Sequence, residues 1–155
     1  LIQAHRPGWG LAVLFIYIDK FKSIHDSYGH DLGDKVLLMV ANRLQSSVRN
    51  DDMVSRWGGD EFVCLLLEVK QEADVTRLAE KMRNMIAETC EFDGTVLSIK
   101  ASIGIAIYPA DGETAEIIFK NADTAMYKAK GIESRVVLFR ESGDREAGHH
   151  QPPHS

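Results

Sequence analysis

The amino-acid sequence predicts an α/β fold in which helices pack around a central sheet that is at least partly antiparallel. A continuous apolar run at residues 11–18, rich in β-branched and aromatic side chains, has the pattern of a central strand. Two shorter strand-like segments, 53–57 and 62–67, are separated only by Gly58 to Glu61, and this spacing predicts a β-hairpin. Helical patterns lie between the strands without strict alternation, which favours a mixed sheet.

The first half of the chain continues from the central strand into two helical segments. Asp19 ends the strand, residues 20–28 have the pattern of a short helix, and Gly29 breaks that helix. A longer helix follows from Leu32, with Asp31 as its expected N-cap. The apolar stripe of this helix consists of Val36, Val40, Leu44 and Val48.

The second half of the chain has two further helical patterns and two further strand-like segments. Residues 72–88 are amphipathic at helical spacing, and residues 95–108 are strand-like throughout. A turn at 109–114 leads into a helix at 115–130, and a last strand is expected at 136–139. The apolar face of the first of these helices consists of Val75, Leu78, Met82 and Ile86.

Composition and charge narrow the class of protein. The chain has 155 residues, 45% hydrophobic and 26% charged, which suits one domain with a hydrophobic core. Its net charge of −5 argues against general nucleic-acid binding, which needs a basic face. Two distant cysteines give neither a disulfide framework nor a zinc motif. Because no apolar run approaches the roughly 20 residues of a membrane span and no signal peptide is visible, we expect a cytoplasmic protein without a membrane segment.

The ends of the chain differ in character from its middle. The chain starts at Leu1 rather than a methionine, so we expect a piece of a longer protein, with 1–10 as the remnant of an upstream helix or linker. Residues 11–139 are expected to form the folded domain. Residues 140–155 lack apolar periodicity and are expected to be a disordered tail or linker.

Two adjacent acids follow two glycines in the predicted hairpin. Asp60 and Glu61 lie where strands end, which is where binding groups commonly sit, and Gly58 and Gly59 leave room for a ligand close to the backbone. Successive strand residues point to opposite faces, so only one of the acids need face a site. Ordinary turn chemistry also explains these residues, and spacing alone leaves both interpretations open.

The end of the first strand offers the parts of a nucleoside-triphosphate site. Mg²⁺ usually takes one or two carboxylates together with nucleotide phosphates, and residues 17–19 are placed to supply a second ligand. The amides of Lys20, Phe21 and Lys22 open a helix, whose N-terminus presents N–H groups to phosphate oxygens, and Lys22 adds a cation. A solvated helix start also fits these residues. Spacing alone therefore predicts a phosphate binder and no more.

Four motifs follow one another along the chain. They read F-I-Y-I-D-K-F-K-S-I-H-D-S-Y-G-H-D-L-G-D, R-W-G-G-D-E-F, A-S-I-G-I-A-I-Y-P-A-D-G and A-D-T-A-M-Y-K-A-K, within about residues 11–139. Together they closely resemble the GGDEF domain of diguanylate cyclases. The resemblance implies a five-stranded sheet surrounded by helices, similar to nucleotidyl cyclases and polymerase palms. It also implies a homodimer in which two GTP molecules condense to cyclic di-GMP with Mg²⁺ or Mn²⁺.

The resemblance assigns roles to individual residues. Asp60 is implied to bind the metal ion near the attacking hydroxyl, with Glu61 as its supporting neighbour and the Ile18 carbonyl as a second ligand. Asp34 is implied to accept hydrogen bonds from the guanine N1–H and N2 amine. The phosphate-binding groups are implied to be the side chains of Lys22 and Lys130 and the amides of Lys20 and Phe21.

Three positions depart from the family pattern. Tyr17 stands where the family has the first aspartate of a D-x-D motif, and a neutral phenol is a poor ligand for Mg²⁺. Asp19 could take over as a metal ligand only if the strand end shifted. His25 stands at a guanine-binding asparagine, and Ser134 stands at a phosphate-binding arginine, with Arg135 one residue away. We therefore expect GTP condensation to be weak or absent.

A second nucleotide site is implied by the segment R-N-D-D. This R-x-x-D motif stands five residues before Gly58, at the place of the family's inhibitory product site. Arg49 can donate to guanine O6 and N7 and stack on the base, and Asp52 can accept from N1–H and N2. A surface ion pair is the alternative interpretation of the same motif.

Three functions remain open from the sequence. The first is a signalling domain of cyclic di-GMP metabolism that condenses GTP weakly or not at all and binds cyclic di-GMP at Arg49 and Asp52. The second is an active diguanylate cyclase with product feedback at that site. The third is a GTP-binding regulatory domain for an attached phosphodiesterase (EAL) domain, and an attached sensory domain is equally compatible with the sequence.

Overall fold

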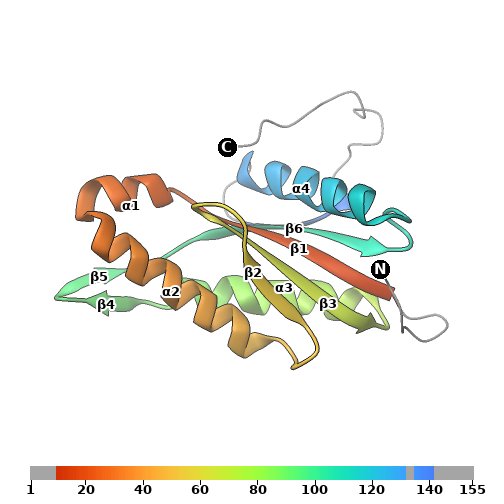
Figure 1. Cartoon of the computed structure of the whole chain (residues 1–155), viewed down its shortest axis with the longest axis horizontal. Helices are drawn as coiled ribbons and strands as arrows, with labels where there is room; N and C mark the ends of the chain where they lie inside the picture. The colour runs from red at the N-terminus through yellow and green to blue at the C-terminus, as the bar shows by residue number, and fades with distance from the viewer. Residues whose placement is uncertain (1–9, 132–134, 142–155) are drawn as a thin grey trace.

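A five-stranded sheet forms the centre of the molecule, with helices on both of its faces (Figure 1). The computed structural model describes residues 10–131 and 135–141. Most of the expected remnant at 1–10 and of the expected tail at 140–155 therefore lies outside the described residues, while Gly10 belongs to the first strand and residues 140 and 141 to a short 3-10 helix. The strands of the sheet are β1 (Gly10–Ile18), β2 (Met53–Arg56), β3 (Glu61–Val69), β6 (Ala101–Tyr108) and β7 (Val136–Leu138). Their order across the sheet is β2-β3-β1-β6-β7.

β1 is the central strand, as its continuous apolar sequence predicts. β3 pairs with it on one side and β6 on the other, both antiparallel, while β7 adds to β6 in parallel. β2 pairs with β3 through the expected hairpin. The prediction of a mixed, partly antiparallel sheet with five strands is confirmed.

The helices divide between the two faces of the sheet (Figure 1). They are α1 (Phe21–Tyr28), α2 (His30–Ser47), α3 (Glu72–Ala87), α4 (Ala115–Gly131) and the short 3-10 helix η1 (Phe139–Glu141). α2 and α3 pack on the face that carries Leu14 and Ile16, and α4 packs on the face that carries Val13 and Phe15. Because successive side chains of β1 point to opposite faces of the sheet, the strand contributes to a separate apolar core on each face. Of the helices in the described part of the chain, none is long and apolar enough to cross a membrane.

The start of α2 differs from the sequence prediction. Gly29 occupies the N-cap instead of Asp31, and no side chain caps the helix there. Gly29 has a φ of 93°, a left-handed value that glycine adopts without strain, so α1 ends and α2 begins on either side of this one residue. Asp31 lies in the first turn of α2, where its negative charge is favourable to the helix dipole.

The single strand expected at 95–108 is divided in the structure. β6 covers its second part, while its first part, β5 (Thr95–Leu97), pairs with β4 (Cys90–Phe92) in a separate two-stranded sheet. The connecting residues Asp93 and Gly94 have φ values of 51° and 87°, as a tight hairpin turn requires. The Asp-Gly pair between alternating residues is the sequence signal for this hairpin, and it outweighs the continuous strand-like composition.

α4 lies directly on β6 because Gly104 has no side chain. A β-carbon built at Gly104 would lie 2.0 Å from the amide nitrogen of Met126 and 2.5 Å from the carbonyl oxygen of Ala122. Ala125, on the same helix, is fully buried. Small residues on both elements thus let the helix backbone reach the sheet, and this contact fixes the last turn of α4, which carries Lys130.

We expect Gly104→Ala to lower the free energy of unfolding by about 2 kcal/mol or more, because the added methyl group must displace the backbone of α4. Gly131→Ala is the matched control, since nothing lies within 4 Å of a β-carbon built there. Urea denaturation of both variants measures the difference. Equal stability of Gly104→Ala and the unaltered chain would contradict the close packing of α4 on β6.

Candidate functional site

The end of β1 meets the turn of the β2–β3 hairpin. The Ile18 amide donates a hydrogen bond to the Asp60 carbonyl at 2.9 Å. Tyr17 lies opposite Glu61, the first residue of β3. Asp19 follows directly at the end of the strand. The structure therefore brings the predicted Asp60, Glu61, Ile18 and Asp19 to one end of the sheet.

Arg56 shapes the glycine turn of the hairpin. Its guanidinium donates to the carbonyls of Gly58 at 3.0 Å and Gly59 at 3.4 Å. The Trp57 amide closes the turn by donating to the Glu61 carbonyl at 2.8 Å. Both glycines are exposed, and a β-carbon built at Gly59 would have nothing within 4 Å. Packing within the domain does not require that glycine, and its surface is open to a ligand.

Tyr17 brings a neutral phenol among the acids. The pKa of its hydroxyl is raised above the ordinary value, first by burial and then by the negative charges of Asp60, Asp19 and Glu61. The phenol is therefore protonated near pH 7 and offers no anionic oxygen. Nζ of Lys130 lies 4.1 Å from the centre of the Tyr17 ring, which is a cation–π distance.

Asp19 is held on the β6 side of β1. The Ser102 hydroxyl lies 2.9 Å and 3.1 Å from the two carboxylate oxygens of Asp19 and donates to them. The Asp19 amide donates to the Lys100 carbonyl at 2.9 Å. Ser102 belongs to β6 and is fully buried, whereas Asp60 lies at the β3 side of the same strand. The two aspartates are thus anchored to opposite neighbours of β1.

A pocket of about 530 Å³ opens beside the end of β1. Lys20, Lys100 and Lys130 line it, together with Tyr17 and Asp19. Its lining has three lysine ammonium groups and one carboxylate, so the pocket carries net positive charge. Positive charge favours the binding of phosphate oxygens.

α1 begins at the edge of this pocket. Lys20 occupies the N-cap with a left-handed φ of 59°, and its carbonyl accepts hydrogen bonds from the amides of Ser23 at 3.0 Å and Ile24 at 3.3 Å. First-turn amides have no partner within a helix, so they are available to an anion. The side chain of Phe21 is buried, and the phosphate role of its amide stays a prediction. Lys22 is exposed on α1 and does not line the pocket.

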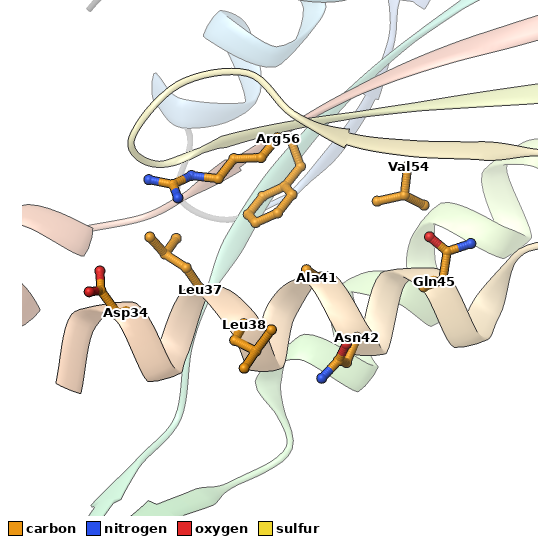
Figure 2. Close-up of a pocket in the computed structure, with 9 residues that line it drawn as sticks. Asp34, Leu37, Leu38, Ala41, Asn42, Gln45, Val54 and Arg56 are labelled. Carbon is orange, nitrogen blue, oxygen red and sulfur yellow. The ribbon is translucent and has the colours of Figure 1, made fainter. Parts of the chain in front are cut away.

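The two residues expected to bind guanine lie on the neighbouring helices α1 and α2. Asp34 lines a groove of about 530 Å³ between α2 and the β2–β3 hairpin, and Arg56 extends toward the end of α2 that carries Asp34 (Figure 2). The His25 ring instead stacks on Phe21 at 5.5 Å and meets His30 edge-on at 3.9 Å. His25 lines neither this groove nor the pocket beside β1. The His25 ring also lies against Gly33 of α2, since a β-carbon built at Gly33 would lie 2.6 Å from its Cδ2, and the shared guanine role of His25 and Asp34 stays a prediction.

Arg49 and Asp52 lie together after α2. Arg49 is exposed, and its Nη2 lies 3.7 Å from Oε1 of Glu68. Asp52 is buried, and its carboxylate accepts hydrogen bonds from the amides of Arg49 at 3.0 Å and Leu67 at 2.9 Å. A pocket of about 310 Å³ adjoins these residues. Both side chains of the R-x-x-D motif are thus on one surface, and their binding of a nucleotide stays a prediction.

The residues at the end of β1 supply only part of the oxygen ligands that Mg²⁺ requires. Within residues 10–131 and 135–141, no three acidic, histidine or cysteine side chains are grouped so that they could hold a metal ion by themselves. Mg²⁺ commonly uses one or two carboxylates and completes its shell with water and nucleotide phosphates. The Asp60 carboxylate and the Ile18 carbonyl fit this partial role, whereas Tyr17 supplies no charged oxygen. These residues fit a cation that is carried in with a nucleotide.

Residues 1–135 match the family described as "Diguanylate cyclase, GGDEF domain". The chain belongs to this family. It is therefore a GGDEF domain of cyclic di-GMP metabolism, with homologues among diguanylate cyclases, which are generally metal-dependent enzymes.

Two relatives from Pseudomonas aeruginosa are much longer than this GGDEF domain. The bifunctional diguanylate cyclase/cyclic di-GMP phosphodiesterase MucR is 48% identical over 140 residues, which are 90% of this chain and 20% of MucR. The cyclic di-GMP phosphodiesterase NbdA is 42% identical over 132 residues, which are 85% of this chain and 17% of NbdA. The chain thus spans about a fifth of the length of these relatives.

A solved structure of the GGDEF domain of TpbB, also from Pseudomonas aeruginosa, has the same fold. It matches with a TM-score of 0.86 at 38% identity, and the match covers 92% of this chain and 83% of that chain. The predicted likeness to the palm-like fold of nucleotidyl cyclases is confirmed by this match.

One of the expected departures from the GGDEF pattern follows α4 in the sequence. Ser134 falls outside the described residues. Arg135 is exposed, and its carbonyl accepts a hydrogen bond from the Ile103 amide at 2.9 Å, which fixes its backbone beside β6. Compensation by Arg135 for the arginine that Ser134 replaces stays a hypothesis.

Four residues of this GGDEF domain were missed by the sequence analysis: Ser102, which holds Asp19; Lys100, which lines the cationic pocket; Arg56, which shapes the glycine turn; and Glu68, which pairs with Arg49. A buried serine between apolar strand residues is a usable signal, because a buried hydroxyl needs a partner. The other three are exposed or half-exposed charges, and no local pattern distinguishes them from ordinary surface residues.

We expect Asp60→Asn to lower the pKa of Tyr17 toward its ordinary value, because the Asp60 charge is one of the causes that raise it. Absorbance titration of tyrosinate, with Tyr17→Phe as the reference that isolates the Tyr17 signal, measures the shift. Asp26→Asn is the matched control, since it removes an exposed charge of α1 that does not contribute to this pKa. An unchanged titration in Asp60→Asn would mean that the carboxylate does not lie near the phenol.

Proposed function

We propose that this GGDEF domain condenses GTP weakly or not at all and binds cyclic di-GMP through Arg49 and Asp52. The observation that carries the first part is Tyr17, a neutral phenol at the position of the family's metal-binding aspartate. The Lys130 ammonium stands over that phenol. Loss of one electrostatic stabiliser typically costs about 10² in rate, so this one change is large enough to suppress turnover.

The remaining residues favour nucleotide binding over turnover. Lys20, Lys100 and Lys130 would neutralise phosphate oxygens in the pocket beside β1. Asp60 and the Ile18 carbonyl would hold a cation that enters with the nucleotide. A bound Mg²⁺ supplies neutralisation of phosphate charge and activation of the attacking hydroxyl. Without a second anionic donor at position 17, these residues align the phosphates but stabilise the transition state poorly.

Asp19 does not restore the missing charge in this proposal. Its carboxylate accepts from the Ser102 hydroxyl on the β6 side of β1. Metal–oxygen distances tolerate changes of only about 0.2 Å, while residues two apart on a strand are separated by about 6.6 Å. Coordination together with Asp60 would therefore require both a break of the serine contact and a shift of the strand end.

The product site carries the second part of the proposal. Arg49 is exposed and presents a guanidinium whose geometry matches O6 and N7 of guanine. Asp52 holds the Arg49 backbone, and its oxygens retain lone pairs for the guanine N1–H and N2 amine. The adjoining pocket offers space for a base.

The proposal includes a partner for the domain. The names and lengths of MucR and NbdA support a longer protein in which this domain is joined to a phosphodiesterase domain. The proposal places this domain in the cytoplasm, where GTP is supplied. NbdA is named as a phosphodiesterase alone, whereas MucR is named as a diguanylate cyclase as well. Any residual condensation would require a homodimer, because each GTP attacks the other.

We expect Tyr17→Asp to raise the rate of cyclic di-GMP formation from GTP by at least about tenfold with Mg²⁺ present, because a carboxylate supplies the missing anionic ligand. Tyr17→Phe removes the hydroxyl without adding charge and should leave the rate unchanged. Chromatography of the product measures all three proteins. Equal rates in all of them would refute the role of Tyr17, and rapid turnover by the unaltered chain would refute weak condensation.

We expect Arg49→Ala to weaken cyclic di-GMP binding by at least about tenfold in titration calorimetry, because it removes charge-assisted hydrogen bonds to guanine. Arg77→Ala is the matched control: the Arg77 side chain is 71% exposed, against 72% for Arg49, and it is likewise paired with an acid. The control should bind normally. Equal affinity of Arg49→Ala and the unaltered chain would place the nucleotide elsewhere.

A further inference from the structure

Asp52 fixes the backbone on both sides of the Arg49 pocket. One oxygen of its buried carboxylate accepts a hydrogen bond from the Arg49 amide, and the other accepts one from the Leu67 amide of β3. The Asp52 amide in turn donates to the Arg49 carbonyl at 3.0 Å. Asp52 therefore joins the loop after α2 to β3, and it positions both Arg49 and the residue that follows Leu67.

That residue is Glu68, and it lies at an irregularity of the β1–β3 ladder. The register shifts between Gly10, which pairs with Val69, and Ala12, which pairs with Leu66. Glu68 has a φ of 56°, a left-handed value that costs energy in a residue with a side chain. An irregularity of this kind redirects a side chain out of the normal alternation of the strand.

The redirected carboxylate of Glu68 meets Arg49. Its Oε1 lies 3.7 Å from Arg49 Nη2, and the Glu68 side chain is only 33% exposed. Both residues line the same pocket of about 310 Å³. The guanidinium thus already has an anionic partner at the place where a guanine base would bind.

We propose that Glu68 is an intramolecular competitor for Arg49 that cyclic di-GMP must displace; this rests on the proposed function of Arg49. Guanidinium N–H groups that face a carboxylate cannot at the same time donate two hydrogen bonds to O6 and N7 of guanine. The ion pair therefore lowers the affinity of the site and raises the nucleotide concentration at which it fills. Because exposed ion pairs are weak, the ligand can displace the carboxylate at physiological ionic strength.

Asp74 offers a matched comparison for Glu68. It is an acid that lines the same pocket, but its partner is Arg77, three residues further along α3. Asp74→Asn and Glu68→Gln remove the same charge from the same pocket. Only Glu68→Gln removes the ion-pair partner of Arg49. Comparison of the two variants therefore separates a specific competitor from a general effect of negative charge in the pocket.

Titration calorimetry of the full chain with cyclic di-GMP tests the competitor. We expect Glu68→Gln to bind about twofold to fivefold more tightly than the unaltered chain, and Asp74→Asn to change less. The double variant Glu68→Gln/Arg49→Ala should lose this gain, because the released group is absent. Circular dichroism checks that the variants are folded.

The outcomes separate this proposal from the one on which it rests. If the unaltered chain binds and Arg49→Ala does not, but Glu68→Gln binds no more tightly than Asp74→Asn, the competitor role is wrong and the product site stands. If Glu68→Gln/Arg49→Ala keeps the gain of Glu68→Gln, the competitor role is also wrong. If none of these proteins binds cyclic di-GMP, both proposals are wrong.

Discussion

The hydrogen bond from the Ile18 amide to the Asp60 carbonyl is the constraint on which the candidate site depends. It ties an exposed glycine turn to the end of a strand that is paired on both sides and buried on both faces. Strands of this kind are among the last parts of a domain to open. The turn takes its position from that rigid strand, with Trp57 packed on Phe15 and Phe119. α4 takes its position from the close contact with Gly104.

The charged residues where the end of β1 meets the glycine turn affect both the stability of the domain and its capacity for catalysis. Asp60, Asp19 and Glu61 all act on the Tyr17 hydroxyl, so a further carboxylate at position 17 would add repulsion among groups that are already close. The neutral ring of Tyr17, whose centre lies 4.1 Å from the Lys130 ammonium, adds no negative charge to this group of acids. Functional sites commonly cost stability in this way. The phenol makes the empty site easier to fold and, in our proposal, less able to catalyse.

The sequence predicted the sheet and most helices because apolar periodicity records which face each element buries. It located the hairpin and the acids at the end of β1, where strand ends converge. It missed the hairpin at Asp93 and Gly94, because strand-like composition on either side concealed a local turn signal. It could not place Glu68 beside Arg49, since that contact depends on an irregular register between β1 and β3. Contacts between distant segments are set by tertiary geometry and leave no pattern in either segment.

Tyr17 also has an evolutionary consequence. None of the contacts described above that anchor Asp60 and Asp19, through the Ile18 amide and the Ser102 hydroxyl, involves the phenol. These anchoring contacts would thus remain with a carboxylate at position 17, and its cost would be the added repulsion among the acids. Tyrosine and aspartate codons differ in their first nucleotide alone. A single point mutation is therefore enough to place an aspartate at position 17.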